Sequence, residues 1–324
     1  MEINPANLQK EIKAFKKGIK RCNELNHVLE AIPAAVDLAY IDAKRTMTGI
    51  GEHEKQKLCA FNAIQIKLRK FFSGQAPVDQ EKFDEKHKEL CEIWCNCFRG
   101  SDIGTFGKAQ KIVNMSFKYL YCCDDALTNY KEHFKFCHMP LDSFTLEWFK
   151  RDVTVREWFK NNKERDTKNP RIISEKMASW SALEYDAEND PKKDAFGFYP
   201  KEGEKKYYSY RFYLENIRNH IDENISKYKK DSGEVLSPLE LEFLVWPESQ
   251  KHLAAEGFFI GLKGISKLKD KKAIRDKSLE VKYKDIIEFL IDNGYREDIL
   301  KFLTKKGYRI VAPDEIKEKA AKAE

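Results

Sequence analysis

The sequence predicts a mainly α-helical protein. Apolar residues recur at intervals of three and four along several long stretches, which is the period of one face of an amphipathic helix. Few segments show the alternating pattern of a β-strand. With 42% hydrophobic residues and only 15 glycines and 10 prolines among 324 residues, the composition excludes collagen-like, low-complexity and wholly disordered chains. At about 150 residues per domain, this length leaves room for two domains.

Residues 1–75 are expected to form an amino-terminal helical region. A first apolar face runs from Leu8 to Leu25, and a second runs from Leu58 to Phe72. The second face ends at a Ser-Gly-Gln-Ala-Pro segment over 73–77, which is typical of a break between helices.

Residues 76–250 are expected to form the core of the protein. An apolar face from Phe83 to Phe98 predicts one helix, and the strongly apolar segment from Ile112 to Tyr121 predicts another. Three glycines between them indicate a turn-rich stretch. From about 151 to 236 the composition shifts to charged and aromatic residues, which we interpret as an insertion in this core.

Residues 251–324 are expected to form a basic carboxy-terminal helical extension. The chain carries 59 basic and 53 acidic residues, and its formal net charge of +6 permits a polyanionic partner without requiring one. A lysine-rich run over 263–277 could contact phosphates on the flank of a duplex. A solvated charged helix explains the same run equally well.

The sequence favours an intracellular protein that needs no metal or other cofactor. No apolar run approaches the ~20 residues that cross a bilayer, so we expect no membrane partner. The eight cysteines are expected to be reduced thiols, and their C-x3-C-x-C spacing over 91–97 matches no known zinc or iron–sulfur pattern. Motifs of serine hydrolases, zinc proteases and nucleotide-triphosphate enzymes do not occur in a fitting context.

The segment over 102–122 is the most informative in the chain. A glycine-rich turn precedes lysines and an apolar helix, and backbone amides at such a helix start can hold a phosphate. Gly104, Gly107 and Lys108 are therefore candidates for contact with a nucleic-acid backbone. An ordinary junction between two helices is the alternative.

Two later segments carry further candidates. Pro140 fixes the backbone just before Asp142, whose carboxylate could cap the helix that follows. Capping alone would explain this aspartate. Glu242 and Trp246 are four residues apart and so share one helical face, where an acid and an indole can hydrogen-bond and stack a base.

Together these segments resemble the helix-hairpin-helix DNA glycosylases, and most closely their archaeal 8-oxoguanine DNA glycosylase branch. In that branch a catalytic lysine opens an apolar helix and a second lysine follows seven positions later, as Lys111 and Lys118 do here. The Pro-x-Asp segment of the branch is matched at 140–142. Its Asp-x-x-x-Trp segment is similar to Glu242 and Trp246, with glutamate in place of aspartate.

The resemblance implies a glycosylase-like helical core and a base-excision repair activity with β-lyase function. Lys111 would attack the sugar C1′ as a neutral amine and form a Schiff base that permits strand cleavage. Asp142 would orient the lysine and stabilise oxocarbenium-like charge. Glu242 and Trp246 would contact the flipped base, an oxidised purine such as 8-oxoguanine.

The resemblance also sets the remaining expectations. Met115 stands where the family has an aromatic residue and is expected in the base pocket, while Lys108 is the alternative nucleophile because it lies nearer the glycines. The implied partner is double-stranded DNA with a damaged base, in the nucleoid if the protein is bacterial or archaeal; protein partners stay unknown. The competing interpretation is a non-catalytic helical module that binds nucleic acid or other proteins.

Overall fold

The computed structural model describes residues 3–19, 21–154, 179–186 and 209–250. The chain divides into two compact units, Met1–Ser249 and Gln250–Glu324, so all but the last of these residues belong to the first unit. The basic extension predicted for 251–324, its lysine-rich run, and much of the predicted insertion lie outside the described residues.

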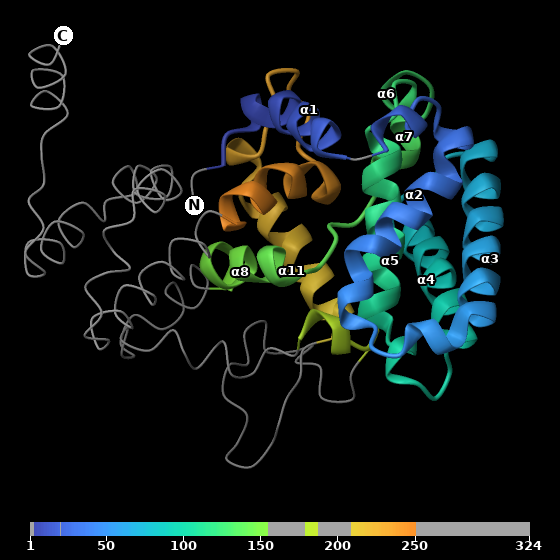
Figure 1. Ribbon diagram of the computed structural model, residues 1–324. Coiled ribbons are helices and arrows are strands. Elements are labelled where there is room, and N and C mark those ends of the chain that lie inside the picture. The colour runs from blue at the N-terminus through green and yellow to red at the C-terminus, as the bar shows by residue number, and fades with distance from the viewer. Residues whose placement is uncertain (1–2, 20, 155–178, 187–208, 251–324) are drawn as a thin grey trace, which may run out of the picture. The chain divides into compact units, whose positions relative to one another are not determined.

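The described part of the chain is mainly helical, as the sequence predicts (Figure 1). Its only β-structure is an isolated bridge between Lys229 and Val235. The α-helices are α1 (Leu8–Gly18), α2 (Val28–Ala43), α3 (Glu54–Ser73), α4 (Gln80–Cys97), α5 (Phe106–Tyr121), α6 (Ala126–Asn129), α7 (Lys131–Phe134), α8 (Ser143–Trp148), α11 (Tyr210–Glu223) and a helix over 238–250. Short 3-10 turns join several of them, including η3 (Lys44–Thr46) and η7 (Trp180–Ala182), and a π-helical turn, Phe149–Thr154, follows α8.

The helices predicted from periodicity are present, with one early end. Helices α3 and α4 lie where their apolar faces place them, and α4 begins at a cap in which Asp79 accepts a hydrogen bond from the Lys82 amide. The face expected to continue to Leu25 stops at Gly18 instead. Ile19 adopts extended backbone angles there, and the chain continues in a short 3-10 turn.

Helix α5 is the centre of the compact unit, and every residue from Phe106 to Tyr121 is buried. It packs most extensively against α2, and also against α4 and η7. Figure 1 shows α2, α3 and α4 grouped near α5, with α1, α8 and α11 on its other side. Because a helix enclosed on all sides leaves no face to water, its polar side chains need partners inside the protein.

The start of α5 corrects the prediction for the glycine-rich turn. The helix begins at Phe106, capped by the Thr105 hydroxyl, so Gly107 lies within its first turn. The Gly107 amide donates to the Leu183 carbonyl at 2.8 Å, and a Cβ at this position would overlap the Trp180 carbonyl oxygen. The glycine therefore permits the 179–186 segment to approach the helix closely.

The neighbouring candidates for phosphate contact are also used within the protein. The Gly104 amide donates to the Ser101 carbonyl at 2.9 Å, and a Cβ on Gly104 would overlap the Phe98 carbonyl oxygen. The Lys108 amide donates to the Thr105 hydroxyl, and its Nζ donates to the Asp102 carbonyl. These contacts give Gly104, Gly107 and Lys108 a packing role, and the expected phosphate contact stays a prediction.

No described helix combines the length and apolarity that a transmembrane span requires.

The packing role of Gly107 predicts the effect of adding one methyl group. Gly107→Ala should lower the free energy of unfolding by about 1–3 kcal/mol, because the new Cβ meets backbone that cannot rotate away. Gly51→Ala is the matched control, since nothing lies within 4 Å of its Cβ position. Urea unfolding of both variants measures the difference. Equal stabilities, with a loss of DNA affinity only in Gly107→Ala, would instead support a phosphate-binding turn.

Candidate functional site

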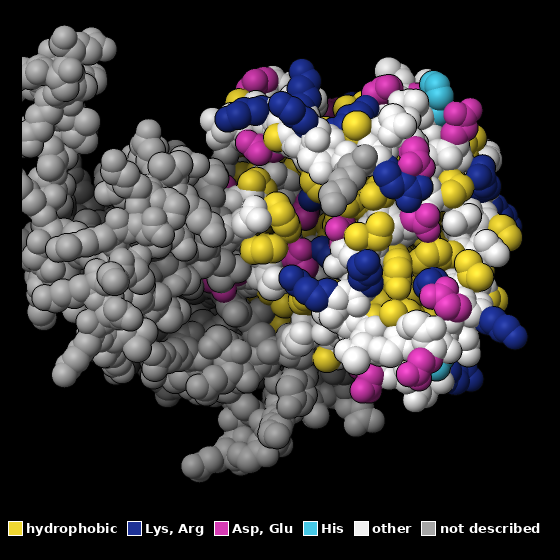
Figure 2. All heavy atoms as spheres, viewed as in Figure 1, with side chains coloured by type: hydrophobic (Ala, Val, Ile, Leu, Met, Phe, Trp, Pro, Cys, Tyr) yellow, Lys and Arg dark blue, Asp and Glu magenta, His cyan; other side chains and the backbone are white. Residues whose placement is uncertain are grey.

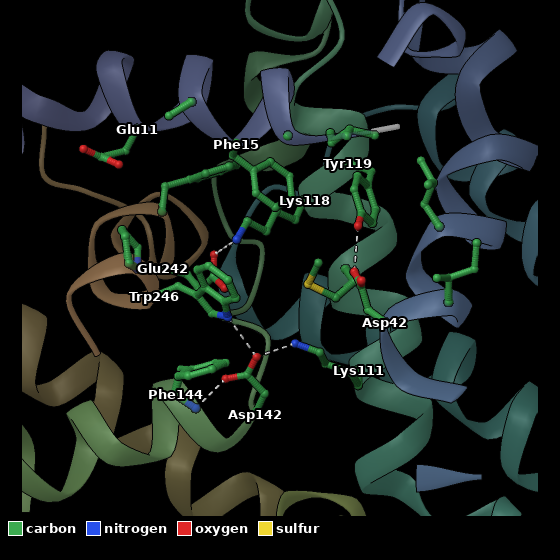
Figure 3. Close-up of a pocket in the computed structure, with 18 of the residues that line it drawn as sticks. Glu11, Phe15, Asp42, Lys111, Lys118, Tyr119, Asp142, Phe144, Glu242 and Trp246 are labelled. Atoms are coloured by element: carbon green, nitrogen blue, oxygen red, sulfur yellow. Dashed lines mark hydrogen bonds and ion pairs between the residues drawn. The ribbon is translucent and has the colours of Figure 1, made fainter. Parts of the chain in front are cut away.

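A cavity of about 950 Å³ lies beside α5, and it brings together residues far apart in the sequence. Its walls come from α1, α2, α5, the start of α8 and the helix over 238–250 (Figure 3). Ligand sites in proteins commonly enclose ~300–1,000 Å³, so this cavity is at the upper end of that range. Residues Lys111, Met115, Lys118, Asp142, Glu242 and Trp246 all line it.

Lys111 and Asp142 form a buried ion pair at this cavity. The Lys111 Nζ lies 2.7 Å from the Asp142 Oδ2, and the two side chains are only 6% and 10% exposed. Lys111 comes from the second turn of α5, whereas Asp142 precedes α8. The pair therefore joins two elements separated by 31 positions.

Asp142 divides its two carboxylate oxygens between two tasks. Oδ1 accepts the amides of Phe144 and Thr145 at 2.9 and 3.0 Å, and the Thr145 hydroxyl accepts the Asp142 amide, which completes a capping box. The expected cap is thus confirmed. Because the helix cap uses Oδ1, Oδ2 can accept the hydrogen bond from Lys111.

The charge state of Asp142 follows from these contacts. Burial alone would raise the pKa of this carboxyl, but the Lys111 ammonium and the Thr145 amide outweigh it and lower the pKa below its ordinary value. Asp142 is therefore ionised at neutral pH, as a group that stabilises developing positive charge must be.

Two aromatic rings lie next to the ion pair. The Trp246 indole Nε1 donates to the Asp142 Oδ2 at 3.3 Å, so this oxygen has both a lysine and a tryptophan as partners. The Phe144 ring is 5.0 Å from the Trp246 ring and meets it edge-on. Both side chains are partly exposed and line the cavity, where they offer apolar faces to a ligand (Figure 3).

A second buried ion pair lies deeper in the same wall. Lys118 pairs with the Glu242 Oε2, and their side chains are 3% and 0% exposed. The Lys118 Nζ lies over the Phe15 and Phe243 rings at 4.1 and 4.7 Å from their centroids. Burial raises the pKa of Glu242, and Lys118 opposes that rise. Within the described residues, the Glu242 Oε1 has no hydrogen-bond partner.

The two lysine candidates for nucleophile differ in position. Lys111 lines the cavity, as does Met115 one turn later on the same face of α5. Lys108 is not among the lining residues, and its ammonium is bound to the Asp102 carbonyl. The geometry therefore favours Lys111 over Lys108.

Several lining residues were not anticipated from the sequence. Phe15 comes from α1, Phe144 from α8, and Asp42, which accepts the Tyr119 hydroxyl at 2.7 Å, from the end of α2. Lys118 was named from the sequence as the second lysine of the resemblance, and it lies on the same face of α5 as Lys111 and Met115. Asp42 is exposed, and no sequence pattern pointed to it.

The cysteines bear on a possible metal site, and the surface charges bear on a possible nucleic-acid-binding surface. Cys91, Cys122, Cys123 and Cys137 are buried free thiols, and the described residues contain no group of three or more His, Cys, Asp and Glu side chains placed to hold a metal. On the described part of the face in Figure 2, basic and acidic side chains are interspersed. This face therefore carries no uniformly basic patch.

No protein-family model, curated protein or solved structure matches the chain significantly. Function is therefore inferred from the geometry of the cavity.

The buried ion pair predicts a large effect of removing one charge. Asp142→Asn keeps a capping side chain but leaves the Lys111 charge unpaired, so it should lower the free energy of unfolding by about 3–5 kcal/mol at pH 7. Asp79→Asn is the matched control, because Asp79 is also a helix cap but is exposed. Its effect should stay within a few tenths of a kcal/mol.

The same pair predicts how this difference depends on pH. The folded-state pKa of Asp142 lies below its ordinary value of 3.8, so its stabilisation is complete above that pH and is lost as the pH falls below it. Urea unfolding of wild type and Asp142→Asn should give the same difference at pH 7 and pH 5, and a smaller one below pH 3.8. A difference that vanishes already at pH 5 would contradict this assignment.

Proposed function

We propose that this protein is a DNA glycosylase with β-lyase activity that removes an oxidised purine, such as 8-oxoguanine, through a lysine nucleophile. The observation that carries the proposal is the pairing of Lys111 with an ionised Asp142 at 2.7 Å on the wall of a cavity large enough for a nucleobase. A lysine beside a carboxylate is the pair that such a mechanism needs: one group to attack the sugar and one to stabilise the charge that develops on it.

The cavity supports the binding of a flipped base. An enzyme that acts on a base in duplex DNA must unstack it at a cost of a few kcal/mol, which contacts in the pocket must offset. Trp246 and Phe144 provide aromatic faces at the cavity wall, and stacking on such a face contributes ~1–3 kcal/mol per base. Both rings lie beside Asp142, so a base held by them would bring its sugar near the ion pair.

The proposed reaction begins when the Lys111 ammonium gives a proton to solvent water, so that Asp142 stays ionised. Its free electron pair attacks the sugar C1′, the glycosidic bond breaks, and the base leaves with the bonding electrons and takes up a proton. Asp142 stabilises the positive charge that develops on the sugar. The resulting Schiff base between Lys111 and the opened sugar then permits β-elimination of the 3′ phosphate.

Glu242 supports a preference for guanine-type bases. Its Oε1 is a buried acceptor without a partner in the described residues, and the Watson–Crick edge of guanine presents two N–H donors where adenine presents an acceptor at N1. Because the carboxylate is fully covered, contact with a base requires the side chains around Lys118 to move. Glu242 would therefore distinguish guanine-type bases from adenine only as the base enters the cavity.

Reductive trapping tests the proposal. Borohydride should link the wild-type protein covalently to a duplex that contains 8-oxoguanine, because it reduces the Schiff base to a stable amine. Lys111→Gln should lose the adduct, whereas Lys108→Gln, which changes the rival lysine three positions away, should retain it. An undamaged duplex of the same sequence controls for non-specific linkage.

Three results would reject the mechanism. The first is an absence of trapping on 8-oxoguanine and on a panel of related oxidised purines. The second is unchanged trapping in Lys111→Gln, and the third is loss of trapping in Lys108→Gln alone. Tight binding of the duplex without any adduct would instead support a non-catalytic nucleic-acid module.

A further inference from the structure

Gln110 ties helix α5 directly to the segment that carries Asp142. It precedes Lys111 in α5 and is fully buried. Its side-chain Nε2 donates to the Leu141 carbonyl at 2.8 Å, and its Oε1 accepts the Leu141 amide at 3.2 Å. One side-chain amide thus binds both backbone groups of the residue that precedes Asp142.

The orientation of the Gln110 amide is itself fixed. Its Nε2 also donates to the Gly107 carbonyl at 3.0 Å, and its Oε1 also accepts the Asn114 Nδ2 at 3.0 Å. Both donor hydrogens and the acceptor oxygen are therefore in use. A fully satisfied buried amide holds one rotamer, because any other would leave polar groups unpaired.

Asn114 extends these contacts into a buried network. It donates to the Tyr210 hydroxyl at 3.1 Å and pairs with the His87 Nε2 at 2.7 Å, while the same hydroxyl pairs with the His138 Nδ1 at 2.8 Å. Burial lowers the pKa of His87 and lowers that of His138 to about 4, so both rings are neutral at pH 7. The network joins α4, α5, α11 and the segment before Asp142 without depending on charged histidines.

We propose that Gln110 is a positioning residue that holds Asp142 at ion-pair distance from Lys111. Lys111 follows Gln110 in sequence, and Asp142 follows Leu141. The hydrogen bonds between Gln110 and Leu141 therefore fix where the 139–142 segment lies along α5. Its catalytic consequence rests on the proposed glycosylase function. A displacement of about 1 Å in such a site can cost ~100-fold in rate.

The decisive variant is Gln110→Met, which keeps the length of the side chain and removes its hydrogen bonds. The single-turnover rate of base release from 8-oxoguanine DNA should fall at least tenfold, while the Kd for that DNA changes less than twofold. Hydrogen exchange of the Phe144 and Thr145 amides, both donors to Asp142, should accelerate at least tenfold in the free protein. If Gln110 only stabilised the fold, Gln110→Met would change the rate and the Kd together.

Gln80→Met is the matched control. The Gln80 Nε2 donates to the Phe136 carbonyl at 3.1 Å and to the Asp84 carboxylate at 3.0 Å. Gln80 therefore also binds the chain between α7 and α8, but six residues before Asp142. This variant should leave rate and exchange within twofold of wild type. Equal effects of the two variants would show general loosening and overturn the proposal.

A second perturbation guards against a misfolded Gln110→Met. Replacing Leu141 by its α-hydroxy acid removes the N–H that the Gln110 Oε1 accepts, and it also weakens the Pro140 carbonyl as an acceptor of the Thr145 hydroxyl. It should accelerate exchange at Phe144 and Thr145 at least threefold. Unchanged exchange in this protein, or in a folded Gln110→Met, would overturn the proposal. Wild-type protein without glycosylase activity would reject the proposed function, whereas the exchange data would still decide whether Gln110 positions Asp142.

Discussion

The buried contact between Lys111 and Asp142 is the interaction on which the site depends. Two opposite charges withdrawn from water stabilise each other only at short range and only with their remaining hydrogen bonds satisfied. Asp142 meets this condition because one carboxylate oxygen accepts backbone amides at the start of α8 and the other accepts from Lys111 and Trp246. The pair thus fixes α8 against α5, and the tryptophan against both.

The enclosure of α5 explains why so much polar chemistry gathers around it. A helix buried on every side must satisfy each polar side chain internally, and α5 carries Gln110, Lys111, Asn114 and Lys118 in such positions. Lys111 and Lys118 face the cavity with Asp142 and Glu242 as partners, while Gln110 and Asn114 join the hydrogen-bond network. One helix therefore supplies both the candidate reactive group and its support.

Local patterns predicted α3, α4 and most of α5, but they did not predict α2 or α11, and they said less about how the helices meet. The apolar periods located α3 and α4, and the Pro-x-Asp segment predicted the cap at Asp142, because both depend on neighbours in sequence. The spacing of Lys111 and Lys118 carried the family resemblance, and both residues line the cavity. The roles of Gly107 and Gln110 could not be predicted, since each depends on a distant segment, 179–186 or 139–142, that packs against α5 only in the folded chain.

The proposed function requires that the cavity admit a nucleobase whose sugar then meets Lys111. A crystal structure of Lys111→Gln bound to a duplex with a single 8-oxoguanine tests it most directly. We expect the base in the cavity, against the Trp246 and Phe144 side chains, with the sugar C1′ about 3–3.5 Å from the side chain at position 111. A base that stays stacked in the duplex, or that binds away from this cavity, would contradict the account.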